Sequence, residues 1–279
     1  MPIHDQGYRR YGGQRDGFGR GWLVITVAGI RTMIRKRLFL ALLLAAWIPF
    51  VVRAVLIYAA ANFPNASFLA VSVQTFQDFL SQQESFVFFV TIYAGAGLIA
   101  NDRRANALQI YLSKPLSRAE YVAGKLGVLM VFLLLVTWAP SMLLLVVQVM
   151  LTGSFAFVKA HLFLVPAMTV YSFIATGLAS FTMLALSSLS KSSRFVGIMY
   201  TGVIFFTQAI YGVIYAVTGG RTAAWLSISA NLDQVGHAVF RLPPRYETPL
   251  IASLAVIVGL ILLSLVILER RVRGIEIVT

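Results

Sequence analysis

Six apolar runs of roughly 20 residues, separated by shorter polar segments, dominate this 279-residue sequence. Each run is long enough to cross the ~30 Å hydrocarbon core of a bilayer as an α-helix. Only 12% of the residues are charged, about half the share that a soluble domain carries. Ten-residue alternating segments, which are typical of membrane β-barrels, do not occur in the sequence. The pattern therefore predicts an all-α integral membrane protein.

The predicted spans cover residues 38–60, 84–100, 126–150, 163–187, 195–217 and 249–268. Pro49 predicts a kink in the first of them. We treat residues 38–279 as one six-span domain. Because the number of spans is even, both ends of the chain are expected on the same side of the membrane.

The distribution of basic residues indicates which side that is. Of the 23 Lys and Arg residues, 8 lie in residues 1–37, 5 in 101–125, 2 in 189–194 and 3 after 268, whereas the opposite loops hold 4. An excess of Lys and Arg marks the cytoplasmic side. Both termini are therefore expected in the cytoplasm, and the chain is expected in the cell (inner) membrane of a bacterium. This bias accounts for the net charge of +13 without a nucleic-acid partner.

The chain begins with a Gly-, Arg- and Tyr-rich segment, residues 1–20, that lacks an apolar core and is expected to be a disordered basic tail. Residues 21–37 are amphipathic and too short in apolar length to span, so we expect a helix in the membrane interface. Its apolar face is predicted to consist of Leu23, Val27, Ile30 and Ile34.

Two longer segments are expected on the outer side. Residues 61–83 are rich in Asn and Gln and are expected to form a polar connection. Residues 218–248 are half apolar, which favours a structured cap before the last span over a plain loop.

A polar island at residues 101–125 interrupts the apolar runs. Its pattern predicts a short helix over 103–113, which Pro115 ends because the residue before a proline is disfavoured in the α region. Ser117 and Glu120 then form a capping box, with Leu116 and Tyr121 at the hydrophobic-staple positions.

The helix that begins at Arg118 is predicted to continue to about Met150, which makes it ~50 Å long and ~20 Å longer than the bilayer core. The excess would hold the 103–113 helix away from the membrane, where Leu108, Tyr111 and Leu112 could enter a groove of a soluble partner. A short interfacial helix beneath the headgroups is the alternative.

The run Ile110–Lys125 resembles the L-L-S-x-P-V-S-R…G-K segment of ABC-2 type permeases, the membrane subunits of ATP-binding-cassette exporters. The layout is also similar to that family, with an interfacial N-terminal helix, six spans and an outer segment before the last span. The long polar loop and the short lumenal linkers resemble the branch associated with multicopper-enzyme maturation. The matching positions are Ser113, Pro115, Ser117, Arg118, Gly124 and Lys125, and with Glu120 they make up the coupling segment of this chain.

The resemblance implies that this segment carries the coupling helix, which docks on the ATP-hydrolysing subunit. The docking residues would be Arg103, Arg104, Leu108, Tyr111 and Leu112. The resemblance also implies a second permease copy, or a related chain, in the complex. The family usually has glutamates and a Gly-Thr pair where this chain has Asp102, Arg103, Ala105 and Asn106, so the coupling surface of this chain is more basic than is usual in the family.

No cofactor site is expected in this chain. It contains no P-loop sequence, because Gly124-Lys125 lacks the upstream glycine and is followed by Leu126. ATP and Mg²⁺ would therefore be bound by the partner subunit. Gly95–Ala100 matches a dinucleotide-binding pattern, but it lies in an apolar run, where small residues favour close helix packing. The sequence has no cysteine and three scattered histidines, so no metal site is expected.

The candidate transport pathway is sparsely polar. Arg53 is the one charge that we expect inside a span, where it either reaches the outer interface or contacts an anionic substrate or lipid. Ser172, Thr176 and Ser180 in the fourth span either bond neighbouring helices or line a polar passage. Such a pathway suits a lipid-like, amphipathic or neutral substrate.

The sequence thus predicts a non-enzymatic permease of an ABC exporter. The alternative is a membrane scaffold or sensor that docks the same ATPase without transporting a substrate. A membrane enzyme would need an intramembrane acid or histidine cluster, and the sequence indicates none.

Overall fold

The computed structural model describes residues 21–62, 71–107 and 116–272. The predicted tail at 1–20 lies outside these ranges. Within them the chain is helical and contains no strand. The elements are α1 (Gly21–Ile34), α2 (Arg37–Ala46), α3 (Ile48–Asn62), α4 (Val73–Gly95), α5 (Ala100–Arg104), α7 (Arg118–Val136), α8 (Trp138–Thr152), α9 (Ala156–Ala160), α10 (Leu164–Leu189), α11 (Ser193–Thr218), the 3₁₀ turn η2 (Thr222–Leu226), α12 (Ile228–Val239) and α13 (Leu250–Arg271).

Six helical segments in the described ranges are long and apolar enough to cross a membrane. They are Arg37–Asn62, Val73–Arg104, Arg118–Thr152, Leu164–Leu189, Ser193–Thr218 and Leu250–Arg271. The predicted all-α membrane fold with six spans is confirmed.

Two spans are divided by a break next to a proline. The first is interrupted at Trp47, between α2 and α3, and the third at Thr137, between α7 and α8. Pro49 and Pro140 follow these breaks closely, and a proline removes one helical hydrogen bond and clashes with the carbonyl four residues earlier. The interruption at Trp47 agrees with the kink predicted at Pro49. The segment predicted to run from Arg118 to about Met150 spans Arg118–Thr152, with an interruption at Thr137.

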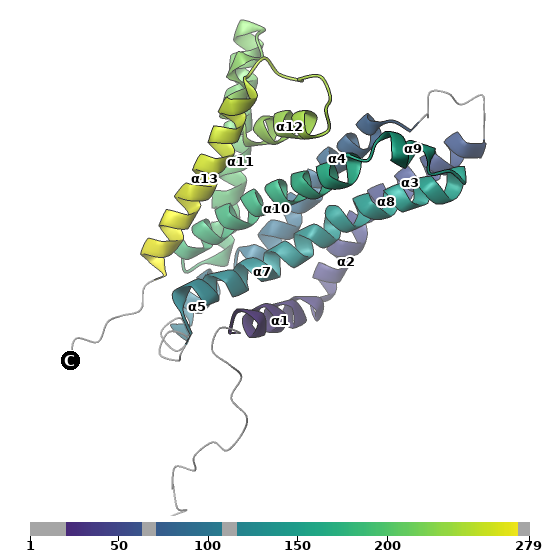
Figure 1. The fold of residues 1–279 in the computed structure, drawn as a ribbon. Coiled ribbons are helices and arrows are strands. Elements are labelled where there is room, and N and C mark those ends of the chain that lie inside the picture. Colours follow the sequence, from purple (N-terminus) through teal and green to yellow (C-terminus); the bar gives the residue numbers. More distant parts are fainter. Residues whose placement is uncertain (1–20, 63–70, 108–115, 273–279) are drawn as a thin grey trace, which may run out of the picture.

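Helix α10 lies at the centre of the bundle and packs against α4, α7 and α13 (Figure 1). Small residues allow this close approach. A Cβ added at Gly95 of α4 would lie 2.5 Å from Met183 Cγ of α10 and 3.2 Å from the methyl carbons of Leu129 of α7. The close packing predicted for the Gly95–Ala100 run is therefore confirmed at Gly95.

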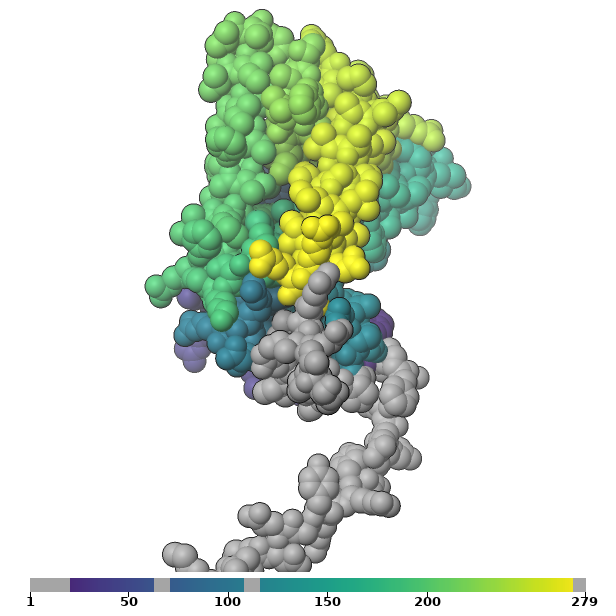
Figure 2. Space-filling model, turned by 90° about the vertical axis from the view of Figure 1, so that its left-hand side faces the viewer, coloured from purple at the N-terminus to yellow at the C-terminus, as the bar shows by residue number. Residues whose placement is uncertain are grey.

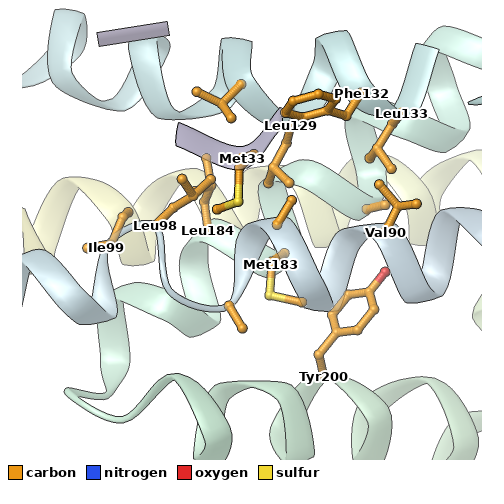
Figure 3. Close-up of a cluster of buried hydrophobic side chains, with 14 of the residues drawn as sticks. Met33, Val90, Leu98, Ile99, Leu129, Phe132, Leu133, Met183, Leu184 and Tyr200 are labelled. Atoms are coloured by element: carbon orange, nitrogen blue, oxygen red, sulfur yellow. The ribbon is translucent and has the colours of Figure 1, made fainter. Parts of the chain in front are cut away.

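An apolar core joins α1, α4, α7, α10 and α11 near the end of the bundle that carries α5. Figure 3 shows Met33 reaching this core beside Leu129, with Met183 and Tyr200 on neighbouring helices. We call this end of the molecule the α5 end. A second apolar core lies toward α12, which we call the α12 end.

Helix α1 lies against α7 and does not stand apart from the bundle. Thr26 and Met33 are buried, whereas Leu23, Val27 and Ile34 are exposed. Three of the four residues predicted to form an apolar face therefore point away from the protein. This arrangement leaves them free to contact lipid, as an interfacial helix would require.

The predicted polar connection over 61–83 is corrected by the structure, because α4 already begins at Val73. Gln77 and Gln83 are buried on this helix, where they have hydrogen-bond partners on other elements. Residues 63–70 of the connection lie outside the described ranges. The structured segment predicted over 218–248 is present as η2 and the buried helix α12.

Candidate functional site

The α5 end contains the only described part of the predicted coupling helix. Helix α5 ends at Arg104, and Asn106 has a φ of 53°. This left-handed conformation interrupts an α-helix, so the single helix predicted over 103–113 does not run through residue 106. Leu108, Tyr111, Leu112, Ser113 and Pro115 lie outside the described residues, and their predicted roles stay predictions.

The start of α5 is bonded to the end of α10. Ser187 Oγ accepts hydrogen bonds from the backbone N–H groups of Ile99 at 3.1 Å and Ala100 at 3.0 Å, and donates to the carbonyl of Ala96 at 2.9 Å. These N–H groups would otherwise lack partners at the start of a helix. One buried serine thus fixes the connection between α4 and α5 to α10.

Arg103 strengthens the same attachment. Its guanidinium donates to the backbone carbonyl of Ser188, near the last residue of α10. A cation at a helix C-terminus is favourable because the terminal carbonyls lack partners and carry partial negative charge. Arg103 was predicted as a docking residue, and the structure gives it this internal contact. Its neighbour Arg104 is exposed.

A second set of contacts joins α5 to α7. Asp102 Oδ2 lies 2.6 Å from Lys125 Nζ and accepts a hydrogen bond from Tyr121 Oη at 2.8 Å. The side chains of both ionic partners are largely buried, so solvent screens the pair less than it screens a surface pair. Helix α5 is therefore bonded to both α7 and α10, two of the long helices of the bundle.

The start of α7 has the predicted capping box. Ser117 Oγ accepts from the N–H of Glu120 at 3.1 Å, and Glu120 Oε2 accepts from the N–H of Ser117 at 2.9 Å. The capping-box prediction is confirmed. Arg118, the first residue of the helix, is exposed.

Gly124 has a role in packing that the sequence did not indicate. A Cβ at this position would lie 2.7 Å from Ile25 Cβ and 2.9 Å from the carbonyl oxygen of Trp22. The Gly124 carbonyl also accepts a hydrogen bond from Thr26 Oγ1 at 3.0 Å. The glycine lets α1 approach the backbone of α7, which places α1 directly beside Lys125.

The predicted pathway residues are not gathered at one place in the described structure. Ser172, Thr176 and Ser180 are fully buried on α10, and Thr176 Oγ1 donates to the Ser172 carbonyl at 2.7 Å. Arg53 lies on α3 and is half-buried.

The structure reveals a polar network at the α12 end that the sequence analysis missed. Gln77, Ser81 and Glu84 follow one face of α4 at helical spacing. Gln77 Nε2 and Ser81 Oγ donate to Asp233 Oδ1 on α12, at 3.0 and 3.3 Å. Glu84 accepts a hydrogen bond from Tyr171 Oη of α10. The expectation that Arg53 is the only charge inside a span is therefore wrong, because Glu84 lies midway along the second span.

The counter-charge of Asp233 comes from the segment after α12. Arg245 Nη1 lies 2.8 Å from Asp233 Oδ2, and this carboxylate raises the pKa of the Arg245 guanidinium. Burial, followed by the negative charge of Asp233, raises the pKa of Tyr246 to about 12, so its phenol stays protonated. The ion pair ties the segment before the last span to α12.

The same network contains the residue types of a hydrolase triad without the geometry of one. Ser81 donates directly to Asp233, and His237 Nδ1 lies 2.8 Å from the carbonyl oxygen of Pro243. A triad needs the imidazole between the serine and the carboxylate. The described residues also contain no group of three His, Cys, Asp or Glu side chains placed to hold a metal ion.

A family model described as ABC-2 family transporter protein matches residues 23–272, which include every helix described above except the first two residues of α1. No curated protein matches the chain.

Proposed function

The chain belongs to the ABC-2 family of transporter proteins, and from that membership we propose that it is the permease of an ATP-driven exporter. The membrane subunit of an ABC transporter moves the substrate, and its partner hydrolyses ATP. We further propose that two permease chains, identical or related, assemble with two cytoplasmic ATPase subunits in the cell membrane. Both termini and the α5 end would then face the cytoplasm, as the Lys and Arg distribution predicts.

The absence of a P-loop supports the assignment of ATP hydrolysis to a partner. No part of the 279-residue sequence has the glycine spacing that cradles a nucleotide phosphate. The sequence has one Gly-Lys pair, Gly124-Lys125. Gly124 accepts a hydrogen bond from α1, and Lys125 forms an ion pair with α5. ATP and Mg²⁺ are therefore assigned to the ATPase subunit.

The attachment of α5 to two long helices is the observation that carries the proposal. Asp102 bonds α5 to α7, and Arg103 bonds it to α10. A partner that pushes on the segment after α5 would move both helices together, because polar contacts join α5 to each of them. A rigid-body movement of this kind is one of the ways in which a local event changes a whole bundle.

The proposal predicts that the segment after α5 carries the ATPase contact. Replacing Leu108 and Leu112 together by glutamate should abolish co-purification of the ATPase subunit with the permease, while the permease still inserts into the membrane. Leu162, exposed beside the start of α10, provides a matched control: Leu162→Glu should leave co-purification unchanged. Unchanged co-purification in the double variant would reject the docking assignment.

A scaffold or sensor that docks the ATPase without transport is the second candidate, because it would use the same α5 attachment. Reconstituted permease and ATPase distinguish the two. Stimulation of ATP hydrolysis by a lipid-like, amphipathic or neutral compound supports transport, and the absence of stimulation by any such compound supports the scaffold.

A further inference from the structure

A small, partly open cavity lies between α4, α10, α11 and α12. Its volume is about 60 Å³, room for about four water molecules. Most of its wall is apolar, made by residues such as Val87, Leu178, Ile204 and Leu232. Glu84 is the one carboxylate on this wall. An acid in such surroundings is costly unless its charge is matched or neutralised.

Glu84 has no cation beside it in the part of the chain that the structure describes. Its hydrogen-bond partner there is the hydroxyl of Tyr171, and no ion pair is formed. Asp233, the nearby acid, is in contrast paired with Arg245 at 2.8 Å. The protein thus supplies a cation to one of the two acids and leaves the other with a neutral donor.

Two aromatic rings line the cavity together with Glu84. Phe88 follows Glu84 by one helical turn on α4, and its ring stacks on that of Tyr200 of α11, with 5.8 Å between ring centroids. Aromatic faces attract cations, and alkyl ammonium groups are commonly bound by aromatic rings close to a carboxylate. The wall therefore has two features that each recognise a positive group.

The cavity is too small for a whole amphipathic molecule and large enough for its headgroup. Figure 2 shows the surface hollowed between α11, in green, and α13, in yellow. Large apolar side chains, among them Phe205, Phe206 and Val213, are exposed on α11. An apolar tail that left the cavity along α11, which lines it with Tyr200 and Ile204, would meet this apolar surface.

We propose that this cavity binds the ammonium headgroup of an amphipathic amine, with Glu84 as its counter-charge and Phe88 and Tyr200 as its aromatic walls. The proposal rests on the proposed function, because it names the chemical class of the substrate. Tyr171 is a positioning residue in this site, since its hydroxyl holds the Glu84 carboxylate.

Dansylcadaverine, a fluorescent compound with a primary ammonium group on a five-carbon chain, is a suitable probe. The permease is placed in nanodiscs of phosphatidylcholine, and binding is followed by fluorescence anisotropy. Glu84→Gln keeps an acceptor for Tyr171 and removes the charge, so the Kd should rise at least about tenfold. Asp78→Asn, an acid on the same helix that bonds Gln74 outside the cavity, should leave the Kd unchanged.

Three further measurements keep the proposal testable if Glu84→Gln does not fold. The N-acetylated probe, which has no charge, should bind the wild type at least about tenfold more weakly than dansylcadaverine does. Phe88→Leu should raise the Kd for dansylcadaverine about threefold through the loss of a cation–π contact. Glu84→Asp, which keeps the charge, should still bind dansylcadaverine more tightly than it binds the N-acetylated probe.

Equal binding of the charged and acetylated probes by the wild type would overturn the proposal, as would an unchanged Kd in Glu84→Gln. This measurement needs no ATPase subunit. Failure to bind the amine therefore leaves the co-purification test intact, and failure of co-purification leaves amine binding measurable.

Discussion

Lys125 Nζ on α7 lies 2.6 Å from Asp102 Oδ2 on α5. The two residues come from the flanks of one polar island in the sequence, and the fold uses them to tie a short helix to a long one. Because α5 is also bonded to α10 through Arg103, its position cannot change without a change in the long helices.

Asp102→Asn should uncouple the ATPase from the permease without releasing it. The substitution removes the ion pair with Lys125 and keeps an acceptor for Tyr121. We expect stimulation of ATP hydrolysis by substrate to fall about fivefold or more, with co-purification unchanged. Asp78→Asn serves as the control at the other end of the bundle, and equal stimulation in the two variants would contradict the role of the Asp102–Lys125 pair.

Loss of the helix cap at Ser117 should lower the stability of the permease. Ser117→Ala removes the acceptor for the N–H of Glu120 and should cost about 1 kcal/mol. Ser117→Asp, which can cap the same N–H, should restore most of the loss. Thermal unfolding of the purified permease measures both, and a melting temperature that is unchanged in Ser117→Ala would show that the cap is not needed.

Gly124→Ala should separate α1 from α7. The new methyl group would lie within 3 Å of Ile25 Cβ and the Trp22 carbonyl oxygen, so the two helices must move apart. Gly177→Ala provides the matched control, since nothing lies within 4 Å of a Cβ there and alanine is favoured over glycine in a helix by about 1 kcal/mol. We expect a lower melting temperature and faster proteolysis near α1 for the first variant only. Similar behaviour of the two would refute the close contact.

Asp233→Asn should loosen the segment between α11 and α13. It breaks the ion pair with Arg245 and places an amide group opposite the Gln77 donor, at a cost of about 1–3 kcal/mol. Hydrogen exchange in α12 should rise, while Glu247→Gln, an exposed acid of the same segment, should leave it unchanged. Protection of α12 that is equal in both variants would argue against this anchor.

Much of the fold could be predicted because hydropathy, proline positions and capping motifs can each be read from residues close together in the sequence. The number of spans, the kink near Pro49 and the cap at Ser117 each depend on residues within a few positions of one another. The start of the second span could not be found in this way. From the sequence alone, Gln77 and Gln83 look like solvent-exposed polar residues. Their burial is understood only from their hydrogen bonds to other helices.

The candidate site likewise contains residues that a local motif predicts and residues whose role depends on distant contacts. The capping box at Ser117 and Glu120 was visible as a motif, whereas Gly124 resembled part of a motif and is in fact the contact between two helices. Glu84 was overlooked because it stood at the edge of an apolar run. Its spacing from Gln77 and Ser81, seven and three residues apart, is the signal that could have placed all three on one helix face.

The sequence by itself determined that this chain is an all-α membrane protein with six spans and no P-loop sequence, because span length and motif spacing are properties of contiguous residues. The tertiary structure decided which polar residues are paired and which are left without a counter-charge. Asp102 pairs with Lys125, and Asp233 with Arg245, only when segments separate in the sequence pack together. The same packing leaves Glu84 on the wall of a cavity.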